Sequence, residues 1–142
     1  MEETSIIPQL QEANTVQLSL TAEWKTIGDY SIKAIYGSSA TEKSIGFNLK
    51  DDLLIPFKNQ TVKFQADIYA DSDNSFRAII YQKTESNPTW KTVASANLNK
   101  GSQTITLTAS IPNDITLLWL RIDSLVNVSK TIFTDNWRVL KQ

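Results

Sequence analysis

The chain has 142 residues, 41% of them hydrophobic and 20% charged, which predicts one globular domain around a single core. Its net charge of −1 gives no field to attract phosphate, so neither a nucleic acid nor an anionic membrane is an expected partner. Cysteine and histidine are absent, which excludes disulfides, zinc sites, thiol nucleophiles and histidine bases. Only a hard cation such as calcium remains as a candidate metal.

The chain begins with a polar, non-periodic stretch. We interpret residues 1–14 as a lead-in segment, either a tail or an edge strand, and residues 15–142 as a single β-sandwich domain. The first residues lack the apolar stretch of a secretory signal, so we expect an excised module or part of an assembly that is exported without one. No apolar run approaches the roughly 18 residues that cross a bilayer, so membrane insertion is not expected.

From residue 16 onwards, apolar and polar residues alternate in short segments separated by turn formers. Strands are expected at residues 16–22, 30–36, 44–49, 61–70, 75–84, 90–98, 104–109, 116–125 and 131–140. A period of two means that one face is buried and the other is wet, as in antiparallel sheets. Residues 71–74, Asp-Ser-Asp-Asn, are interpreted as the turn of a hairpin.

These segments predict an all-β fold, an antiparallel β-sandwich with the jelly-roll topology and about nine strands. No stretch of ten residues has the apolar spacing of a helix. The residues that share the buried phase, and so form the predicted core, are Val62, Phe64, Ile68, Phe76, Ile80, Leu107, Leu118, Leu120 and Ile122.

Two motifs carry a resemblance to a known family. Residues 28–34, GDYSIKA, are similar to the "G-x-Y-S-L-K-V" strand of the carbohydrate-binding jelly rolls of families four, nine and twenty-two. Residues 133–139, FTDNWRV, resemble the closing "Y-I-D-N-V-x-L" strand of the same families. Such jelly rolls occur as accessory modules of secreted glycoside hydrolases, in adhesins, and in phage tail and virion proteins. The resemblance therefore implies an extracellular or virion-associated, lectin-like domain.

The resemblance also implies a structural calcium ion. Family members often open with "F-E-x-G", whose acidic residue holds calcium against the aspartate of the closing motif. Asp135 occupies that closing position, but residues 11–14, QEAN, lack both the aromatic residue and the glycine. Asp135 is therefore a candidate calcium ligand whose N-terminal partner stays open.

The strand at 116–125 would place Leu118, Leu120 and Ile122 on one face and Trp119, Arg121 and Asp123 on the other. An indole beside charged groups suits a sugar ring, because the ring face stacks while its hydroxyls bond. We predict one concave, solvent-open surface whose ligand-binding residues are Trp119, Arg121, Asp67, Tyr69, Arg77 and Tyr81. The alternative is an ordinary solvated face on which these charges pair across strands.

The remaining tryptophans and carboxylates receive weaker assignments. Trp90 and Trp137 are predicted to fill the core, whereas Trp24 could take either role. Asp67 and Asp123 could in principle form the carboxylate pair of a glycosidase, but nothing in the sequence indicates an enclosed cleft. We therefore expect no enzyme activity.

Two functions remain. The first is a non-catalytic carbohydrate-binding module that binds a polysaccharide or cell-surface glycan on the concave sheet. The second is a structural or adhesion domain of a larger assembly, such as a phage tail, baseplate or capsid decoration protein, whose partners are other subunits. A solvent-facing Trp119 favours the first, and a buried or subunit-covered Trp119 favours the second.

Overall fold

The computed structural model describes residues 2–5, 16–26, 28–38 and 44–141. Its strands are β1 (Glu2–Ser5), β2 (Val16–Thr21), β3 (Ser31–Tyr36), β4 (Ser44–Lys50), β5 (Thr61–Ala70), β6 (Phe76–Thr84), β7 (Lys91–Asn97), β8 (Gly101–Ser110), β9 (Ile115–Ser124) and β10 (Lys130–Lys141). Two short 3₁₀ turns, Asp51–Leu53 and Ile55–Phe57, connect β4 to β5.

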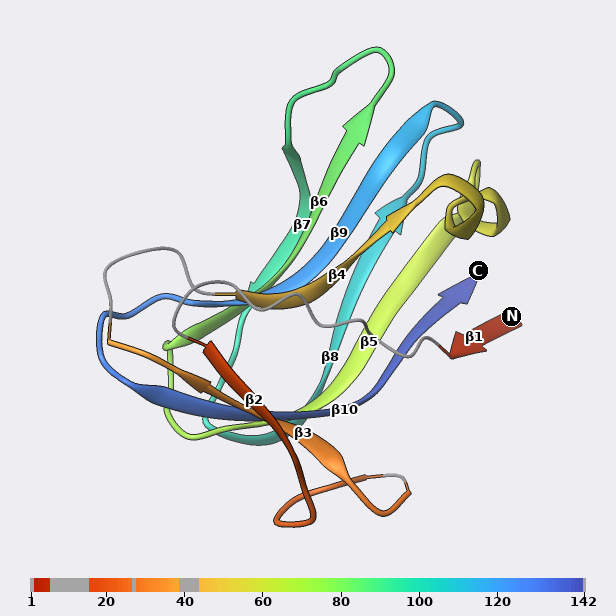
Figure 1. Cartoon of the computed structure of the whole chain (residues 1–142). Coiled ribbons are helices and arrows are strands. Elements are labelled where there is room, and N and C mark those ends of the chain that lie inside the picture. Colours follow the sequence, from red (N-terminus) through yellow and green to blue (C-terminus); the bar gives the residue numbers. More distant parts are fainter. Residues whose placement is uncertain (1, 6–15, 27, 39–43, 142) are drawn as a thin grey trace.

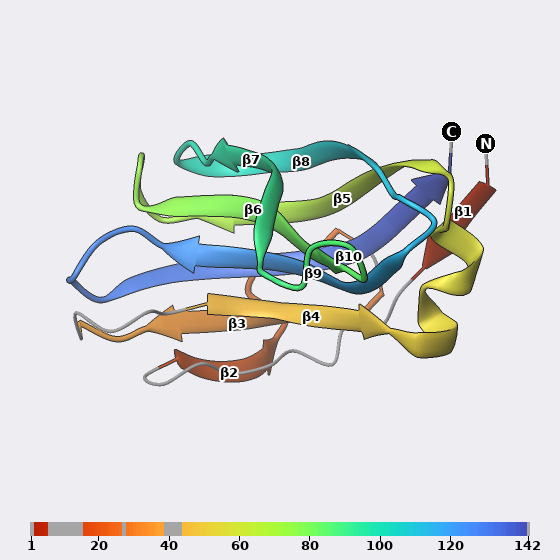
Figure 2. The same ribbon diagram turned by 90° about the horizontal axis from the view of Figure 1, so that it is seen from above.

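The strands form two antiparallel sheets that pack face to face (Figures 1 and 2). The six-stranded sheet has the order β2-β3-β10-β5-β8, with β1 also paired to β10, and the four-stranded sheet has the order β4-β9-β6-β7. The predicted all-β sandwich is therefore confirmed. Part of the predicted lead-in segment forms β1, which pairs with the C-terminal strand from Glu2 opposite Lys141 to Ser5 opposite Arg138.

The core lies between the two sheets and follows the predicted alternation. All nine predicted core residues are buried, at no more than 5% exposure. Trp137 is also buried and packs against Phe64 with ring centroids 5.4 Å apart, so its predicted core role is confirmed. Burial of these large side chains supplies most of the driving force for folding.

Both sheets bend in the same direction in Figure 1, so the outer face of the four-stranded sheet is concave. Gly46 of β4 lies opposite Arg121 of β9 on this sheet. A Cβ atom at Gly46 would lie 2.1 Å from the Leu120 carbonyl oxygen, so only glycine permits this close approach.

The connection after β5 differs from the prediction. Residues 71–74 do not close a hairpin, because β5 pairs with β10 and β8 whereas β6 pairs with β9 and β7. The chain thus crosses from the six-stranded to the four-stranded sheet at this connection. As a result, the outward side chains of β5 and β6 lie on opposite outer faces of the sandwich.

Candidate functional site

This crossing divides the six predicted ligand-binding residues between two faces. Asp67 and Tyr69 belong to β5 of the six-stranded sheet. The other four belong to β6 and β9 of the four-stranded sheet, and they are Arg77, Tyr81, Trp119 and Arg121. The prediction that all six share one surface is therefore wrong, although a ligand-binding role for either group stays a prediction.

The concave outer face carries three aromatic side chains in mutual contact, Tyr81, Trp90 and Trp119, which we call the aromatic patch. The ring centroids of Trp90 and Trp119 are 5.4 Å apart, and each lies 6.3 Å from the ring of Tyr81. Tyr81 and Trp119 are half-buried, whereas Trp90 is 38% exposed. The prediction that Trp90 fills the core is therefore wrong. Its indole adds to the outer face instead.

Two cations lie against the aromatic patch. The guanidinium carbon of Arg121 lies 4.7 Å from the ring centroid of Tyr81 and 4.5 Å from that of Trp119. The ammonium of Lys83 lies 4.4 Å from the ring centroid of Trp90. Such cation–π contacts hold the aromatic planes in fixed orientations, because the positive charge is attracted to the ring face.

Arg121 is only 5% exposed, so the prediction that it faces solvent is wrong. Its guanidinium forms a two-point ion pair with Asp123, with Nε donating to Oδ1 at 2.6 Å and Nη2 donating to Oδ2 at 2.8 Å. The Nη2 of Arg77 also donates to Asp123 Oδ2, at 3.1 Å. Arg121 therefore supports the aromatic patch from below rather than presenting donors to a ligand.

The carboxylate pair considered for glycoside hydrolysis is not assembled. Asp123 is 4% exposed and compensates the two arginines, while Asp67 lies on the other sheet. A general acid and a nucleophile must flank one bond, and these two carboxylates face opposite sides of the sandwich.

The outer face of the six-stranded sheet holds a second aromatic group, Trp24, Tyr69 and Phe133, with ring centroids 6.0–6.4 Å apart. Trp24 lies in the connection between β2 and β3, which folds over this face. Its Nε1 donates to the Ser102 hydroxyl at 3.2 Å, and its carbonyl oxygen accepts a hydrogen bond from the Ser31 hydroxyl. Trp24 therefore anchors the β2–β3 connection to the six-stranded sheet.

Thr26 fastens the same connection at a second point. Its hydroxyl donates to Asp67 Oδ2 at 2.7 Å, and its backbone N–H donates to Asp135 Oδ2 at 2.7 Å. Burial acts to raise the pKa of Asp67, but hydrogen bonds from Thr26, Thr104 and Asn136, together with the charge of Arg138, outweigh it and lower that pKa. Asp67 is therefore a charged anchor of this connection.

Asp135 is the residue for which the family resemblance implies calcium. Its Oδ2 accepts the Thr26 N–H at 2.7 Å, and its Oδ1 accepts the Asn136 N–H at 2.9 Å. Within the described residues, no group of three acidic side chains could hold a metal ion. The expected N-terminal partner falls on residues 11–14, which lie outside the described part of the chain, so calcium binding at Asp135 stays a prediction.

Sequence reasoning missed Lys83 and misassigned Trp90. Lys83 has the same phase as Tyr81 in β6, so the alternation alone could have placed it on the outer face. Trp90 precedes an edge strand whose pairing with β6 has an irregularity between Ile80 and Tyr81, and the phase of a side chain cannot be counted across such a bulge.

Comparisons with known proteins give a fold but no sequence match. The sequence matches no model of a protein family, and no curated protein matches it. Among solved structures, the CBM22-1 xylan-binding domain from Paenibacillus barcinonensis has a TM-score of 0.66 at 14% identity, over 93% of this chain and 85% of that one. Modules of carbohydrate-binding families 16, 4 and 11 match as well.

Two further matches belong to longer chains. The CBM22-1 and GH10 modules of endo-1,4-beta-D-xylanase 10B from Clostridium thermocellum, complexed with xylohexaose, match with a TM-score of 0.70 at 12% identity. The enzymatically active domain of bacteriophage CBA120 tailspike protein 4 matches with a TM-score of 0.63 at 11% identity. This chain is covered over 94% and 96%, but it spans only 26% and 19% of those chains. The fold is thus that of the carbohydrate-binding jelly rolls, as the two sequence motifs predicted.

None of the described helices is long and apolar enough to cross a membrane.

Proposed function

We propose that the domain binds a polysaccharide or a cell-surface glycan, without altering it chemically, on the concave face of the four-stranded sheet. The observation that carries the proposal is the aromatic patch, in which Trp90, Trp119 and Tyr81 lie together on one outer face with Trp90 exposed. The solved structures of similar fold include a xylan-binding domain and a structure of CBM22-1 and GH10 modules complexed with xylohexaose, which supports a glycan as ligand.

The chemistry of the patch suits a sugar chain. The axial C–H groups of a pyranose form an apolar face that stacks on an indole, and a rigid aromatic ring loses little conformational entropy on binding. Arg77 lies on the same outer face, four residues before Tyr81 in β6, with 34% of its side chain accessible, and it can donate to hydroxyls of a sugar chain. Arg121 and Asp123 act as positioning residues, since both are buried.

The proposal includes no catalysis. Hydrolysis of a glycoside needs a protonated acid and a second carboxylate on either side of the bond. On the concave face, Asp123 is buried and paired with Arg77 and Arg121, so it is not presented to a ligand. The proposed location is extracellular, as expected for a protein that meets polysaccharides or cell surfaces.

The experiment is a comparison of two tryptophan variants on opposite faces. Trp119→Ala should lower the affinity for soluble polysaccharides in gel retardation by about 30-fold or more, because truncating an aromatic anchor costs about 2 kcal/mol or more. Trp24→Ala is the matched control, since it removes an indole from the six-stranded sheet. Equal affinity of both variants and the unmodified domain would exclude the aromatic patch as the binding surface.

The alternative is a structural domain of a larger assembly, and the match to a phage tailspike protein is the observation that favours it. In that case, the aromatic patch would contact another subunit. This alternative would be supported over glycan binding if the domain formed a stable oligomer and bound none of the soluble polysaccharides, and if the Trp119→Ala variant were monomeric.

A further inference from the structure

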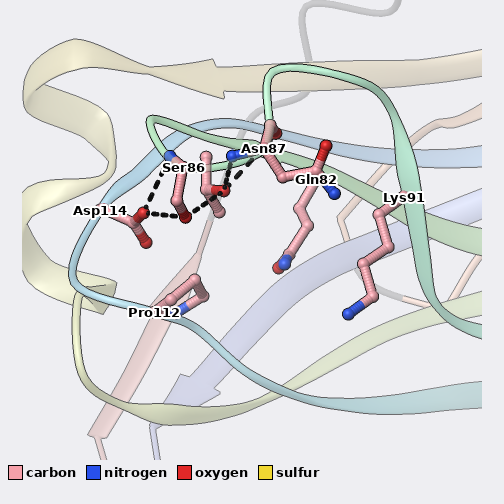
Figure 3. Close-up of a pocket in the computed structure, with 7 residues that line it drawn as sticks. Gln82, Ser86, Asn87, Lys91, Pro112 and Asp114 are labelled. Atoms are coloured by element: carbon pink, nitrogen blue, oxygen red, sulfur yellow. Dashed lines mark hydrogen bonds between the residues drawn. The ribbon is translucent and has the colours of Figure 1, made fainter.

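A polar pocket lies at one end of the sandwich, separate from the aromatic patch. It has a volume of about 240 Å³ and lies between the β6–β7 connection and the β8–β9 connection (Figure 3). Its lining residues, which define the end pocket, are Gln82, Thr84, Ser86, Asn87, Lys91, Pro112 and Asp114. Gln82 directly follows Tyr81 in β6, so the two side chains point to opposite faces of the four-stranded sheet.

Hydrogen bonds hold the walls of the end pocket in place. The Ser86 hydroxyl and backbone N–H both donate to Asp114 Oδ2, at 2.6 Å and 3.2 Å. The Asn87 N–H donates to the Thr84 hydroxyl at 3.0 Å, and the Glu85 N–H donates to the Asp114 carbonyl oxygen at 2.9 Å. The bonds from Ser86 lower the pKa of Asp114 and keep it ionised. The two connections are therefore joined before any ligand arrives.

Two groups of the end pocket have no partner within the part of the chain that the structure describes. The side-chain oxygen of Gln82 is buried and accepts no hydrogen bond. The ammonium of Lys91 makes neither an ion pair nor a hydrogen bond there, and Figure 3 shows its side chain running alongside that of Gln82 at the edge of the end pocket. A buried carbonyl oxygen without a donor costs stability, and a hydroxyl group of a ligand in the end pocket would supply that donor.

We propose that the end pocket binds one neutral polyhydroxylated ring, the size of a single sugar unit. Asp114 and Lys91 contribute opposite charges, so the lining has no net charge that would select an ion, and a neutral polar ligand suits it. Hydroxyl groups can donate to Gln82 and Asp114 and accept from Lys91 at the same time. The volume is below the roughly 300–1,000 Å³ of sites for drug-sized ligands, which limits the ligand to about one ring. This site does not depend on glycan binding at the aromatic patch.

The test is a titration of the ¹⁵N-labelled domain with xylose, glucose, galactose and mannose, each added separately, followed by amide chemical shifts. Saturable shifts are expected for at least one sugar at residues 84–87 and 113–114, which belong to the end pocket and not to the aromatic patch. Gln82→Leu should abolish them while the Tm stays unchanged or rises, because an unpaired buried amide has been removed. A merely structural glutamine would give a lower Tm instead.

Two further variants complete the experiment. Lys91→Met changes an exposed side chain, so folding is preserved, and loss of a charged donor should weaken binding by about tenfold or more. Trp119→Ala should leave these shifts intact, which separates the end pocket from the aromatic patch. The proposal is overturned if none of the four sugars gives saturable shifts, or if Gln82→Leu and Lys91→Met both bind as the unmodified domain does.

Discussion

Replacing Asp123 by asparagine removes the charge that compensates two arginines beneath the aromatic patch. Asp123 and Arg121 are 4% and 5% exposed, so the guanidinium of Arg121 would stay buried without its counter-charge. Removing one partner of a buried ion pair costs about 3–5 kcal/mol. Asparagine keeps one acceptor oxygen and Arg77 is partly exposed, so we expect the lower end, about 3 kcal/mol.

For a chain of 142 residues, this loss corresponds to a fall in Tm of roughly 10 °C. Urea unfolding followed by tryptophan fluorescence measures the free energy, and the exposed Asp29 provides the control variant Asp29→Asn. The double variant Arg121→Met with Asp123→Leu should regain most of the stability, because no buried charge is left unpaired. A change below about 0.5 kcal/mol in Asp123→Asn would refute a buried ion pair at this position.

The pKa of Asp67 is lower in the folded than in the unfolded chain, where it is about 3.9. The charge of Asp67 therefore stabilises the fold above that pH, and this stabilisation is lost as the pH falls through the lower folded-state pKa. Asp67→Asn should flatten the fall in urea midpoint below about pH 4; an unchanged profile would contradict the anchor role. Gly46→Ala should destabilise by about 1–3 kcal/mol in the same assay, because the new Cβ would overlap the Leu120 carbonyl, and equal stability would mean that β4 can shift. The calcium expectation predicts a higher Tm in calcium than in chelator, abolished by Asp135→Asn, and equal melting temperatures at saturating calcium would reject it.

The sequence predicted which side chains face inward but not which sheet each strand joins. Alternation is a local property, so Phe64, Leu118 and Leu120 could be placed in the core from their neighbours alone. The turn formers at 71–74 are equally compatible with a hairpin and with a crossing between sheets, because either connection needs a sharp reversal. The choice is made by the long-range pairings of β5 with β8 and of β6 with β9.

The burial of Arg121 was unpredictable for a similar reason. Its phase in β9 is outward, as predicted, and an outward arginine is normally solvated. Its low exposure depends on Tyr81 and Trp119 stacking against it and on Gly46 allowing β4 to approach closely. Tyr81 belongs to β6 and Gly46 to β4, which pair with β9 on opposite sides. These residues are far apart in the sequence, so no short segment of it reveals both contacts.

The two outer faces both carry three aromatic rings, and the way each set is held decides which one suits a ligand. On the six-stranded sheet, a ligand that needs the face of Trp24 would compete with the hydrogen bonds that tie Trp24 and Thr26 to the sheet. On the four-stranded sheet, the buried Arg121 holds the aromatic patch in place. A ligand that stacks on Trp90 therefore does not have to break a hydrogen bond. A surface that is ordered before binding loses less entropy on association. This difference supports the proposal that a ligand binds on the concave face, even though the number of aromatic rings is the same.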